Sequence, residues 1–309
     1  PTVVPLPLAL LILDYFPLQR RGNKLLLLAE KAPYVLISGA SCFMTIQAQL
    51  GYANLTPVAT FQITDRIAQA VYGLGFYLSK TLVPAGLLAL YPLPEHLSLL
   101  APSVIASAFF VFGMAALSFA GLGGRVALAL WTYYVAMLMP VIGILQNGPQ
   151  LVALRYSYLS CMGWSLVAGG AIIKAFSLWT QGQFRSLRSI VAVALGLWLV
   201  SMTALTQGQI SMWENDKTLW QPVLTAYPRS LFANINMADA LLNQHDYDAA
   251  TPYVDKVVEL SARKDDPRVL ILQAGLLGGK GQLAQARVLL ERTIPSYGGP
   301  EAYYLLGWI

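Results

Sequence analysis

The stretch LQNGPQLVALRYSYLSCMG, residues 145–163, lies between two long apolar runs and decides how the fold is interpreted. It holds a short polar link and then one arginine, Arg155, followed by Tyr156 and Tyr158. An arginine between apolar runs is costly if it faces lipid, so it usually extends to the membrane surface or binds a partner. The stretch therefore predicts a turn between two membrane helices, with Arg155 at the membrane boundary.

The composition of the 309-residue chain is that of a membrane protein, at least in part. Only 11% of the residues are charged and 56% are hydrophobic, whereas soluble domains carry roughly 25% charged residues. Residues 1–208 have 11 Lys and Arg and 4 Asp and Glu, a net charge of +7, whereas residues 209–309 have 9 and 11, a net charge of −2. The positive charge flanks apolar runs, so we expect a lipid bilayer and no nucleic acid among the partners.

Apolar runs of about 20 residues are long enough to cross a bilayer as helices. We expect six spans, the first of them partial, at residues 3–18, 32–50, 97–120, 126–146, 157–178 and 188–206. Residues 61–83 are also long enough, but Asp65, Arg66, Gln69 and Lys80 make them amphipathic. Such a helix lies in the membrane interface or packs inside the bundle, and we expect it not to cross.

The distribution of Lys and Arg orients these spans. If residues 61–83 do not cross, eight basic residues collect on one side of the membrane and three on the other. The basic side is cytoplasmic by the positive-inside rule, so residues 145–163 and everything after residue 206 lie outside the cytoplasm. We expect a bacterial inner membrane with a periplasmic C-terminal domain. The alternative is an endoplasmic reticulum membrane with a lumenal domain.

Small residues recur after residue 209 at the spacing of a helical repeat. Ala250 and Ala286 are 36 residues apart, and Ala274 and Gly307 are 33 apart, close to the 34-residue period of the tetratricopeptide repeat, TPR. Small residues let the two helices of a repeat approach closely. The sequence thus predicts an all-α protein, with a transmembrane helical domain over residues 1–208. A TPR solenoid of about 2.3 repeats follows over residues 209–309.

Several polar residues are candidate site residues, each with a simpler alternative. Arg155 with two phenol hydroxyls suits a phosphate or diphosphate headgroup, or it is an arginine that extends to the surface beside an aromatic belt. Lys80 lies 14 residues after Arg66, about four helical turns, so both could face a headgroup. Asp65 is a possible base or metal ligand, or part of the polar face of its helix.

The C-terminal half offers one candidate groove and no cofactor site. Asn234 and Asn236 could line a repeat groove and bind extended peptide backbone, or they belong to a solvated helix face. His96 and His245 are isolated from each other, so the sequence offers no metal-ligand set and no cofactor site is evident, while dependence on a divalent metal stays open. The repeats favour contact with a protein or peptide.

Five segments resemble the TPR-containing GT-C type membrane glycosyltransferases, among them the transmembrane-and-TPR O-mannosyltransferases and their bacterial relatives. They are LDYFPL (13–18), LSKTLVP (78–84), LYPLP (90–94), residues 138–163 with the RYSYL sequence, and MWENDKTLW (212–220). The resemblance implies a polyprenyl- or dolichyl-phosphate sugar donor and transfer to a protein or other acceptor on the non-cytoplasmic side. It also implies repeats that help to present the acceptor.

Carried onto this sequence, the resemblance places Arg155, Tyr156 and Tyr158 in the external loop of the family, with Arg155 on the donor phosphate. The catalytic acidic residue of such enzymes belongs to the first external loop, which we expect upstream of Pro1 in a longer protein. We therefore expect an integral-membrane glycosyltransferase. A non-catalytic, membrane-anchored TPR scaffold that recruits partner proteins is the alternative, and a transporter for the lipid-linked sugar is a weaker third.

Overall fold

The computed structural model describes residues 4–20, 22–51, 61–143, 148–180, 185–261, 263, 265–295 and 299–308. Residues 145–147 of the polar link lie outside these ranges. The described chain is helical apart from two strands of two and three residues and the connecting loops, which confirms the all-α class. It divides into two compact units, of which the second contains residues 206–309 and also residues 88–92. The inclusion of residues 88–92 in the second unit was not predicted.

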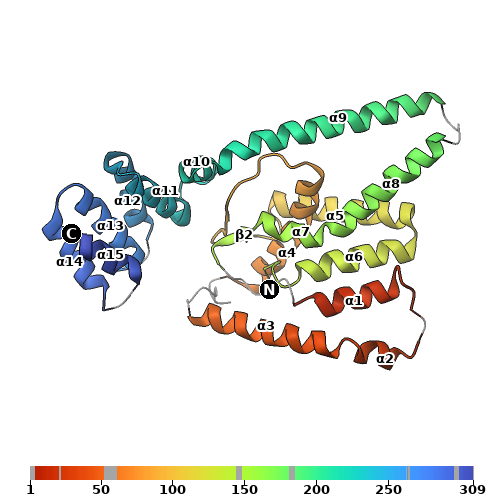
Figure 1. The fold of residues 1–309 in the computed structure, drawn as a ribbon, viewed down its shortest axis with the longest axis horizontal. Coiled ribbons are helices and arrows are strands. Elements are labelled where there is room, and N and C mark those ends of the chain that lie inside the picture. The colour runs from red at the N-terminus through yellow and green to blue at the C-terminus, as the bar shows by residue number, and fades with distance from the viewer. Residues whose placement is uncertain are drawn as a thin grey trace. The chain divides into compact units, whose positions relative to one another are not determined.

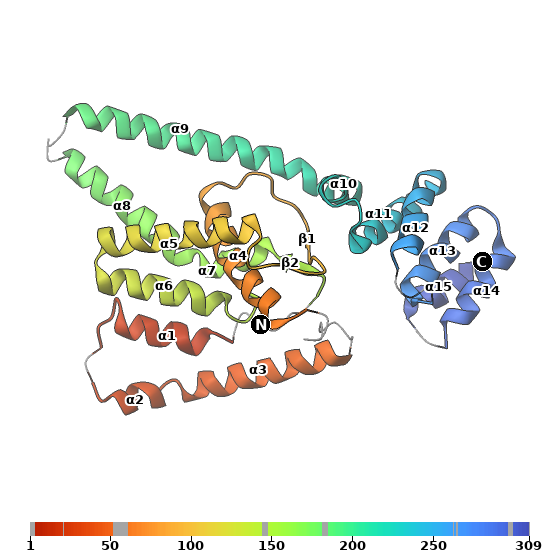
Figure 2. The same cartoon turned by 180° about the vertical axis from the view of Figure 1, so that it is seen from behind.

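The first unit is a bundle of apolar helices (Figures 1 and 2). α6 lies beside both α1 and α5, and α4 packs against α5. Its elements are α1 (Leu6–Tyr15), α2 (Lys24–Ala29), α3 (Ala32–Gly51), α4 (Ile63–Leu82), α5 (Pro102–Leu122), α6 (Gly124–Leu138), β2 (Gln150–Val152), η1 (Leu154–Tyr156), α7 (Ser157–Ser160) and α8 (Met162–Thr180). The long helix α9 (Arg185–Ile210) follows and continues past residue 205.

Helix α4 is the buried element of this bundle. Tyr77 and Leu78 are buried on it, and Gly75 touches α5, where an added Cβ would come within 2.8 Å of the Ser107 Cα. The missing side chain of Gly75 thus lets the two helices approach closely. Of the two positions left open for residues 61–83, the burial agrees with packing inside the bundle.

Among the described residues, three helices are long and apolar enough to cross a membrane: 24–48, 102–122 and 193–213. A fourth is possible if α7 and α8, which meet at a bend of 57°, form one broken span. The apolar helices α1 and α6 are shorter, at 10 and 15 residues. Helices therefore occupy all six predicted positions, but two of them are shorter than the roughly 20 residues that a straight crossing needs.

The outward faces of the three long helices are apolar. No more than 11% of each candidate span is buried inside the structure. Phe109 and Phe112 on α5 and Leu36 on α3 are about three-quarters exposed. Water penalises contiguous apolar surface of this extent, whereas lipid does not. This makes the first unit compatible with a membrane location.

The second unit consists of helices that pack in chain order (Figure 1). Its elements are β1 (Tyr91–Pro92), η2 (Ser211–Trp213), α10 (Asp216–Ala226), α11 (Leu231–Asn243), α12 (Tyr247–Leu260), α13 (Pro267–Gly279), α14 (Leu283–Thr293) and α15 (Pro300–Trp308). α11 and α13 begin at residues 231 and 267, and α12 and α14 at 247 and 283, so the helix pair recurs after 36 residues.

Ser230 and Asp246 cap the first turns of α11 and α12. The Ser230 hydroxyl accepts the Ala233 N–H at 3.3 Å, and the Asp246 carboxylate accepts the Ala249 N–H at 3.2 Å. Each satisfies one of the backbone donors that the first turn of a helix leaves unpaired. Proline at the first position of α13 leaves one fewer unpaired donor, because proline has no backbone N–H.

Small residues hold the helix pairs together. Ala238 and Ala250 have no exposed surface between α11 and α12, and neither have Ala274 and Ala286 between α13 and α14. The main core of the unit surrounds Met237, Val254 and Val257. Leu90 of the 88–92 segment is buried in the same cluster. The backbone N–H of Leu88 donates to the Tyr91 hydroxyl at 3.0 Å, and burial raises the pKa of that phenol.

Candidate functional site

Arg155 lies in the 3₁₀ turn η1, between β2 and α7, and its guanidinium is exposed. The Cζ atom lies 5.1 Å from the centre of the Tyr156 ring, and Nη2 donates to the Tyr156 hydroxyl at 3.4 Å. An arginine above an aromatic face is held in position while most of its donors remain open. The structure thus presents a cation with a fixed orientation at the protein surface.

Helix α4 holds this segment in place. The Gln69 side-chain amide donates to the Leu151 carbonyl at 2.7 Å, and the Ala153 N–H donates to the Tyr77 hydroxyl at 3.2 Å. Gln69 and Tyr77 are eight residues apart and both are buried, so two turns of α4 support the backbone that leads to Arg155.

The residues after Arg155 form a bent junction. The short helix α7 ends at Ser160, whose hydroxyl donates to the Tyr156 carbonyl at 2.9 Å, and α8 starts at Met162. A broken apolar helix of this kind is typical of a span that is interrupted at a functional position, or of a re-entrant segment. Tyr158 is 78% exposed at the junction, which is unusual for so large an apolar surface.

The other two predicted cations are used by the chain itself. The Arg66 Nε donates to the Phe61 carbonyl at 3.1 Å and the residue is buried. The Lys80 ammonium donates to the Ala85 carbonyl at 2.5 Å and lies 5.9 Å from the Phe76 ring centre. The two cations sit at opposite ends of α4, about 21 Å apart along its axis, so the structure does not bring them together.

Asp65 has a structural role. One carboxylate oxygen accepts the Gln62 N–H at 3.1 Å and completes a capping box at the start of α4. The other accepts the Leu97 N–H at 3.3 Å, and the exposed His96 ring lies 3.6 Å from the carboxylate. Both oxygens are therefore used to start α4 and to attach the 93–101 loop to it, which favours the structural alternative over a base or a metal ligand.

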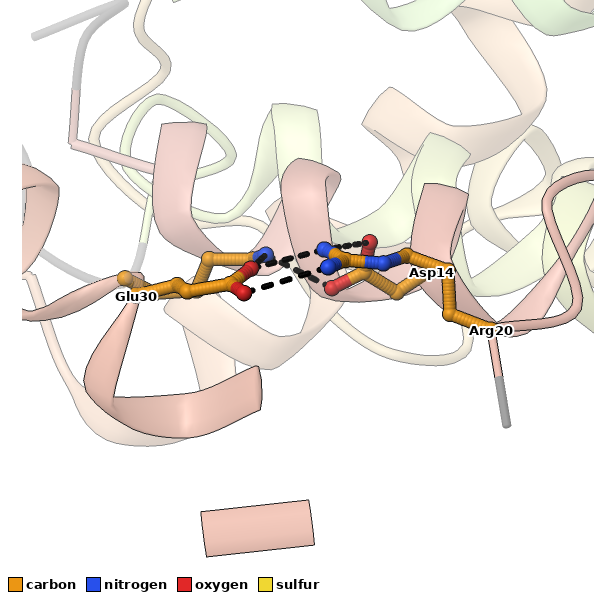
Figure 3. Close-up of polar contacts among 4 residues, drawn as sticks. Asp14, Arg20 and Glu30 are labelled. Atoms are coloured by element: carbon orange, nitrogen blue, oxygen red, sulfur yellow. Dashed lines mark hydrogen bonds and ion pairs between the residues drawn. The ribbon is translucent and has the colours of Figure 1, made fainter. Parts of the chain in front are cut away.

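A second charged cluster joins α1 to the start of α3 (Figure 3). The Arg20 guanidinium lies between two carboxylates, 2.7 Å from Glu30 and 3.4 Å from Asp14. The Lys31 ammonium lies 2.7 Å from Asp14 and 3.3 Å from Glu30. Two cations and two anions compensate one another, so this cluster fixes the turn between the helices and carries no excess charge for a ligand. The positive-inside argument is unaffected, because it counts Lys and Arg rather than net charge.

The two predicted groove residues donate to backbone carbonyls close to them in the chain. The Asn234 amide donates to the Pro228 and Ser230 carbonyls at 3.1 and 2.8 Å, and the residue is only 3% exposed. The Asn236 amide donates to the Phe232 carbonyl at 2.7 Å and is half-buried. Asn234 therefore holds the turn before α11, and its burial favours this structural role over contact with a peptide.

A groove of about 270 Å³ lies elsewhere in the second unit, where α11, α13 and α15 meet. Its lining includes Asp239, His245, Tyr247, Tyr304 and Trp308. The sequence interpretation missed these residues because it located the groove from two asparagines near the start of α11. The usable signal was the group of aromatic residues on α15, of which Tyr304 and Trp308 line the groove.

The Tyr247 ring forms one wall of the groove and rests on Gly279. A Cβ atom at Gly279 would overlap the ring, so the glycine makes this position of the tyrosine possible. The Tyr247 hydroxyl also lies 2.8 Å from the His245 Nδ1. Gly279, the last residue of α13, thus leaves the space that the Tyr247 ring occupies.

Within the described residues, no group of three or more His, Cys, Asp or Glu side chains is placed to hold a metal ion. The two candidate ligand-binding positions are the Arg155 segment of the first unit and the groove of the second. No family model matches this chain, and neither a curated protein nor a solved structure matches it.

Proposed function

We propose that this chain belongs to an integral-membrane glycosyltransferase that takes a sugar from a polyprenyl- or dolichyl-phosphate donor. The acceptor is a protein or another molecule on the non-cytoplasmic side of the membrane. In this proposal the first unit lies in a bacterial inner membrane, and the second is a periplasmic TPR solenoid that contacts the acceptor.

One observation carries the proposal: the exposed Arg155 guanidinium is held on the Tyr156 ring directly before the bend between α7 and α8. A lipid phosphate places its anionic headgroup at the end of apolar helices, and an oriented guanidinium binds phosphate oxygens through two parallel hydrogen bonds. The exposed apolar faces of α3, α5 and α9 are suited to contact with lipid.

The repeat geometry supports the second half of the proposal. Helix pairs recur after 36 residues, and alanine lies at each close contact within a pair. Stacked helix pairs of this length are the general pattern of α-solenoids, which present one face to protein partners. A TPR identity for these pairs remains part of the proposal.

In the proposed reaction, an acceptor hydroxyl attacks the anomeric carbon of the donor sugar while the bond from that carbon to the phosphate oxygen breaks. A carboxylate removes the hydroxyl proton, and the lipid phosphate leaves as an anion. Arg155 stabilises the charge that develops on this leaving group. The carboxylate is not assigned to any described residue.

Lipid binding tests the proposal directly. The full chain in detergent micelles is titrated with a short-chain polyprenyl phosphate, and the polyprenol without phosphate serves as the matched ligand. Loss of a hydrogen bond to a charged group costs about 1.5–3 kcal/mol. Arg155→Ala is therefore expected to weaken phosphate binding roughly 10- to 150-fold and to leave polyprenol binding unchanged.

Arg125→Ala is the control variant, because Arg125 is also exposed but lies in the first turn of α6, 30 residues before Arg155 in the chain. It should bind the polyprenyl phosphate as the wild type does. Equal affinity of the wild type and Arg155→Ala for the phosphate, or equal binding of phosphate and polyprenol, would refute the donor site.

A non-catalytic scaffold remains the second candidate, and one observation favours it. The first unit has four acidic residues, and three of them, Asp14, Glu30 and Asp65, are used in ion pairs or helix capping. A scaffold needs no catalytic carboxylate. Transfer of a labelled sugar from a lipid-phosphate donor by the complete protein in vesicles distinguishes the two candidates.

A further inference from the structure

The Tyr156 hydroxyl has two hydrogen-bond partners among the described residues, and neither of them can accept a proton. The Arg155 Nη2 atom donates to this oxygen at 3.4 Å, and the Gln150 Nε2 atom donates to it at 3.4 Å. Guanidinium and side-chain amide nitrogens are donors without acceptor capacity. The phenolic proton therefore has no acceptor in either contact and is left for a third partner.

The backbone is fixed on both sides of Gln150. The Leu93 N–H donates to the Pro149 carbonyl at 2.8 Å, and the Gln69 amide donates to the Leu151 carbonyl at 2.7 Å. Both neighbours of Gln150 are thus tied to other segments of the first unit, and Gln150 itself is half-buried. A side chain that starts from a fixed backbone loses less freedom when it forms a contact.

Gly148 leaves room for the Gln150 side chain. Its φ of +85° lies in the left-handed region, which favours glycine. A Cβ atom at Gly148 would lie 3.0 Å from the Gln150 Oε1 atom, closer than an ordinary contact. The amide therefore has its oxygen toward Gly148 and its nitrogen toward the Tyr156 hydroxyl. This orientation makes Gln150 a donor to the phenol.

We propose that Gln150 positions the Tyr156 hydroxyl as a donor to the lipid phosphate, so that the phenol and the Arg155 guanidinium bind the same anion. The inference rests on the proposed function, because it names further residues of the same donor site. The phenol oxygen and the Arg155 Nη2 atom are 3.4 Å apart, so both can donate to oxygen atoms of one phosphate group.

Gln150 acts on the anion only through the phenol. Its amide occupies acceptor capacity of the Tyr156 oxygen, which leaves the hydroxyl to donate. Without the amide, the hydroxyl is free to take more orientations, and a donor that has to be oriented on binding stabilises an anion less than one that is already in place. Gln150 is therefore a positioning residue, and Tyr156 is the residue that touches the phosphate.

Two variants test the proposal in the titration with polyprenyl phosphate and polyprenol, using the full chain in detergent micelles. Tyr156→Phe keeps the ring that Arg155 contacts and removes the hydroxyl. It should weaken phosphate binding roughly tenfold or more, as expected for one hydrogen bond to a charged group. Gln150→Met keeps the length of the side chain and removes the amide, and should weaken phosphate binding roughly three- to tenfold. Neither variant should change polyprenol binding.

A double variant separates positioning from direct contact and from folding. Because Gln150 acts through the hydroxyl, Gln150→Met should cause no further weakening in a chain that already carries Tyr156→Phe. Gln221→Met is the control, because it removes the same amide from an exposed position of α10 in the second unit. It should bind as the wild type does. Circular dichroism melting of every variant checks that the fold is retained.

Wild-type affinity of either Tyr156→Phe or Gln150→Met for polyprenyl phosphate would overturn the proposal. A Gln150→Met effect of the same size with and without the Tyr156 hydroxyl would overturn it as well. Arg155→Ala distinguishes these failures from failure of the proposed function. Weakened phosphate binding by Arg155→Ala with wild-type binding by Tyr156→Phe refutes only the inference, whereas wild-type binding by both refutes the donor site itself.

Discussion

Leu90 provides the sharpest test of how the chain is divided. It lies between α4 and α5 in the sequence, yet its side chain is only 7% exposed and belongs to the hydrophobic cluster of the second unit, with Val223, Met237 and Val254. Leu90→Ala is therefore expected to weaken helices that follow it by more than a hundred residues. A residue that packed only against its neighbours in the chain would act only near its own position.

The expected magnitude follows from the burial. Leu→Ala substitutions in protein cores cost about 2–5 kcal/mol, depending on how far the surroundings can relax. Leu90 lies in an irregular segment at one side of its cluster, so we expect a loss in the lower part of that range, about 2–3 kcal/mol. In an exchange experiment this corresponds to a roughly 30- to 150-fold increase in the opening of the second unit.

Hydrogen–deuterium exchange with mass spectrometry measures this opening by region. Peptides from α11 and α12 should exchange faster by the factor above in Leu90→Ala, and peptides from α5 and α6 should be unchanged. Leu100→Ala is the control, because Leu100 is 80% exposed in the same inter-helix loop. Unchanged exchange in α11 and α12 would refute the packing of Leu90 in the second unit.

Three further predictions concern individual contacts. Asp65→Ala removes the capping box of α4 and the acceptor for the Leu97 N–H, so we expect the free energy of unfolding to fall by about 1–2 kcal/mol. The melting temperature should fall as well, and less so for Asp65→Asn. Equal melting temperatures of the wild type and both variants would contradict the capping role. Tyr134→Phe removes the hydrogen bond from the buried phenol to the Leu74 carbonyl, which is 2.6 Å long. In chemical unfolding of the full chain, the free energy of unfolding should fall by about 1 kcal/mol. A variant more stable than the wild type would contradict a stabilising role of this hydrogen bond. The Lys256 ammonium, 2.7 Å from Glu259, lowers the pKa of that carboxyl. The stabilisation from this pair is therefore present above the ordinary carboxyl pKa and is lost as the pH falls through the lowered one. Lys256→Gln should raise the Glu259 pKa in an NMR titration, and an unchanged value would rule the ion pair out as the cause.

The helices of the first unit were predictable because apolar length is a local property. The runs 32–50 and 97–120 became α3 and α5 with small shifts at the ends. The run 126–146 gave only the 15-residue α6, because Pro140 lacks the N–H that a continued helix needs. The bend at Cys161 was not predicted, since no proline or glycine at that residue marks it.

The small residues of the second unit were predictable for a related reason. Small residues at a recurring spacing mark close helix contacts, and the predicted Ala250, Ala274 and Ala286 are fully buried, whereas the predicted Gly307 is exposed with no neighbouring atom within 4 Å of an added Cβ. The packing of residues 88–92 into this unit was beyond the sequence, because the contact joins segments separated by more than a hundred residues. Periodicity carries no information about such pairs.

For the candidate site, the sequence predicted the exposed cation, Arg155, but not the hydrogen-bond partners of the other polar residues. Arg155 and Tyr156 lie together as the sequence indicated, since they are neighbours in the chain. The roles of Arg66, Asp65 and Asn234 depended on whether their polar groups meet the backbone, and each of them does. Spacing along a helix predicts on which face a side chain lies, but it does not predict which backbone carbonyl or N–H that side chain bonds.

The position of Leu90 in the second core also has a consequence for biosynthesis. Leu90 leaves the ribosome 133 residues before Val223, its neighbour in the cluster. At the usual rate of about 5–20 residues per second, that interval is on the order of ten seconds. During this time the segment LLALYP, residues 87–92, has no core to enter. The second unit therefore closes on a segment synthesised long before it, and the nascent chain has to keep that segment free of competing contacts until the last helices arrive.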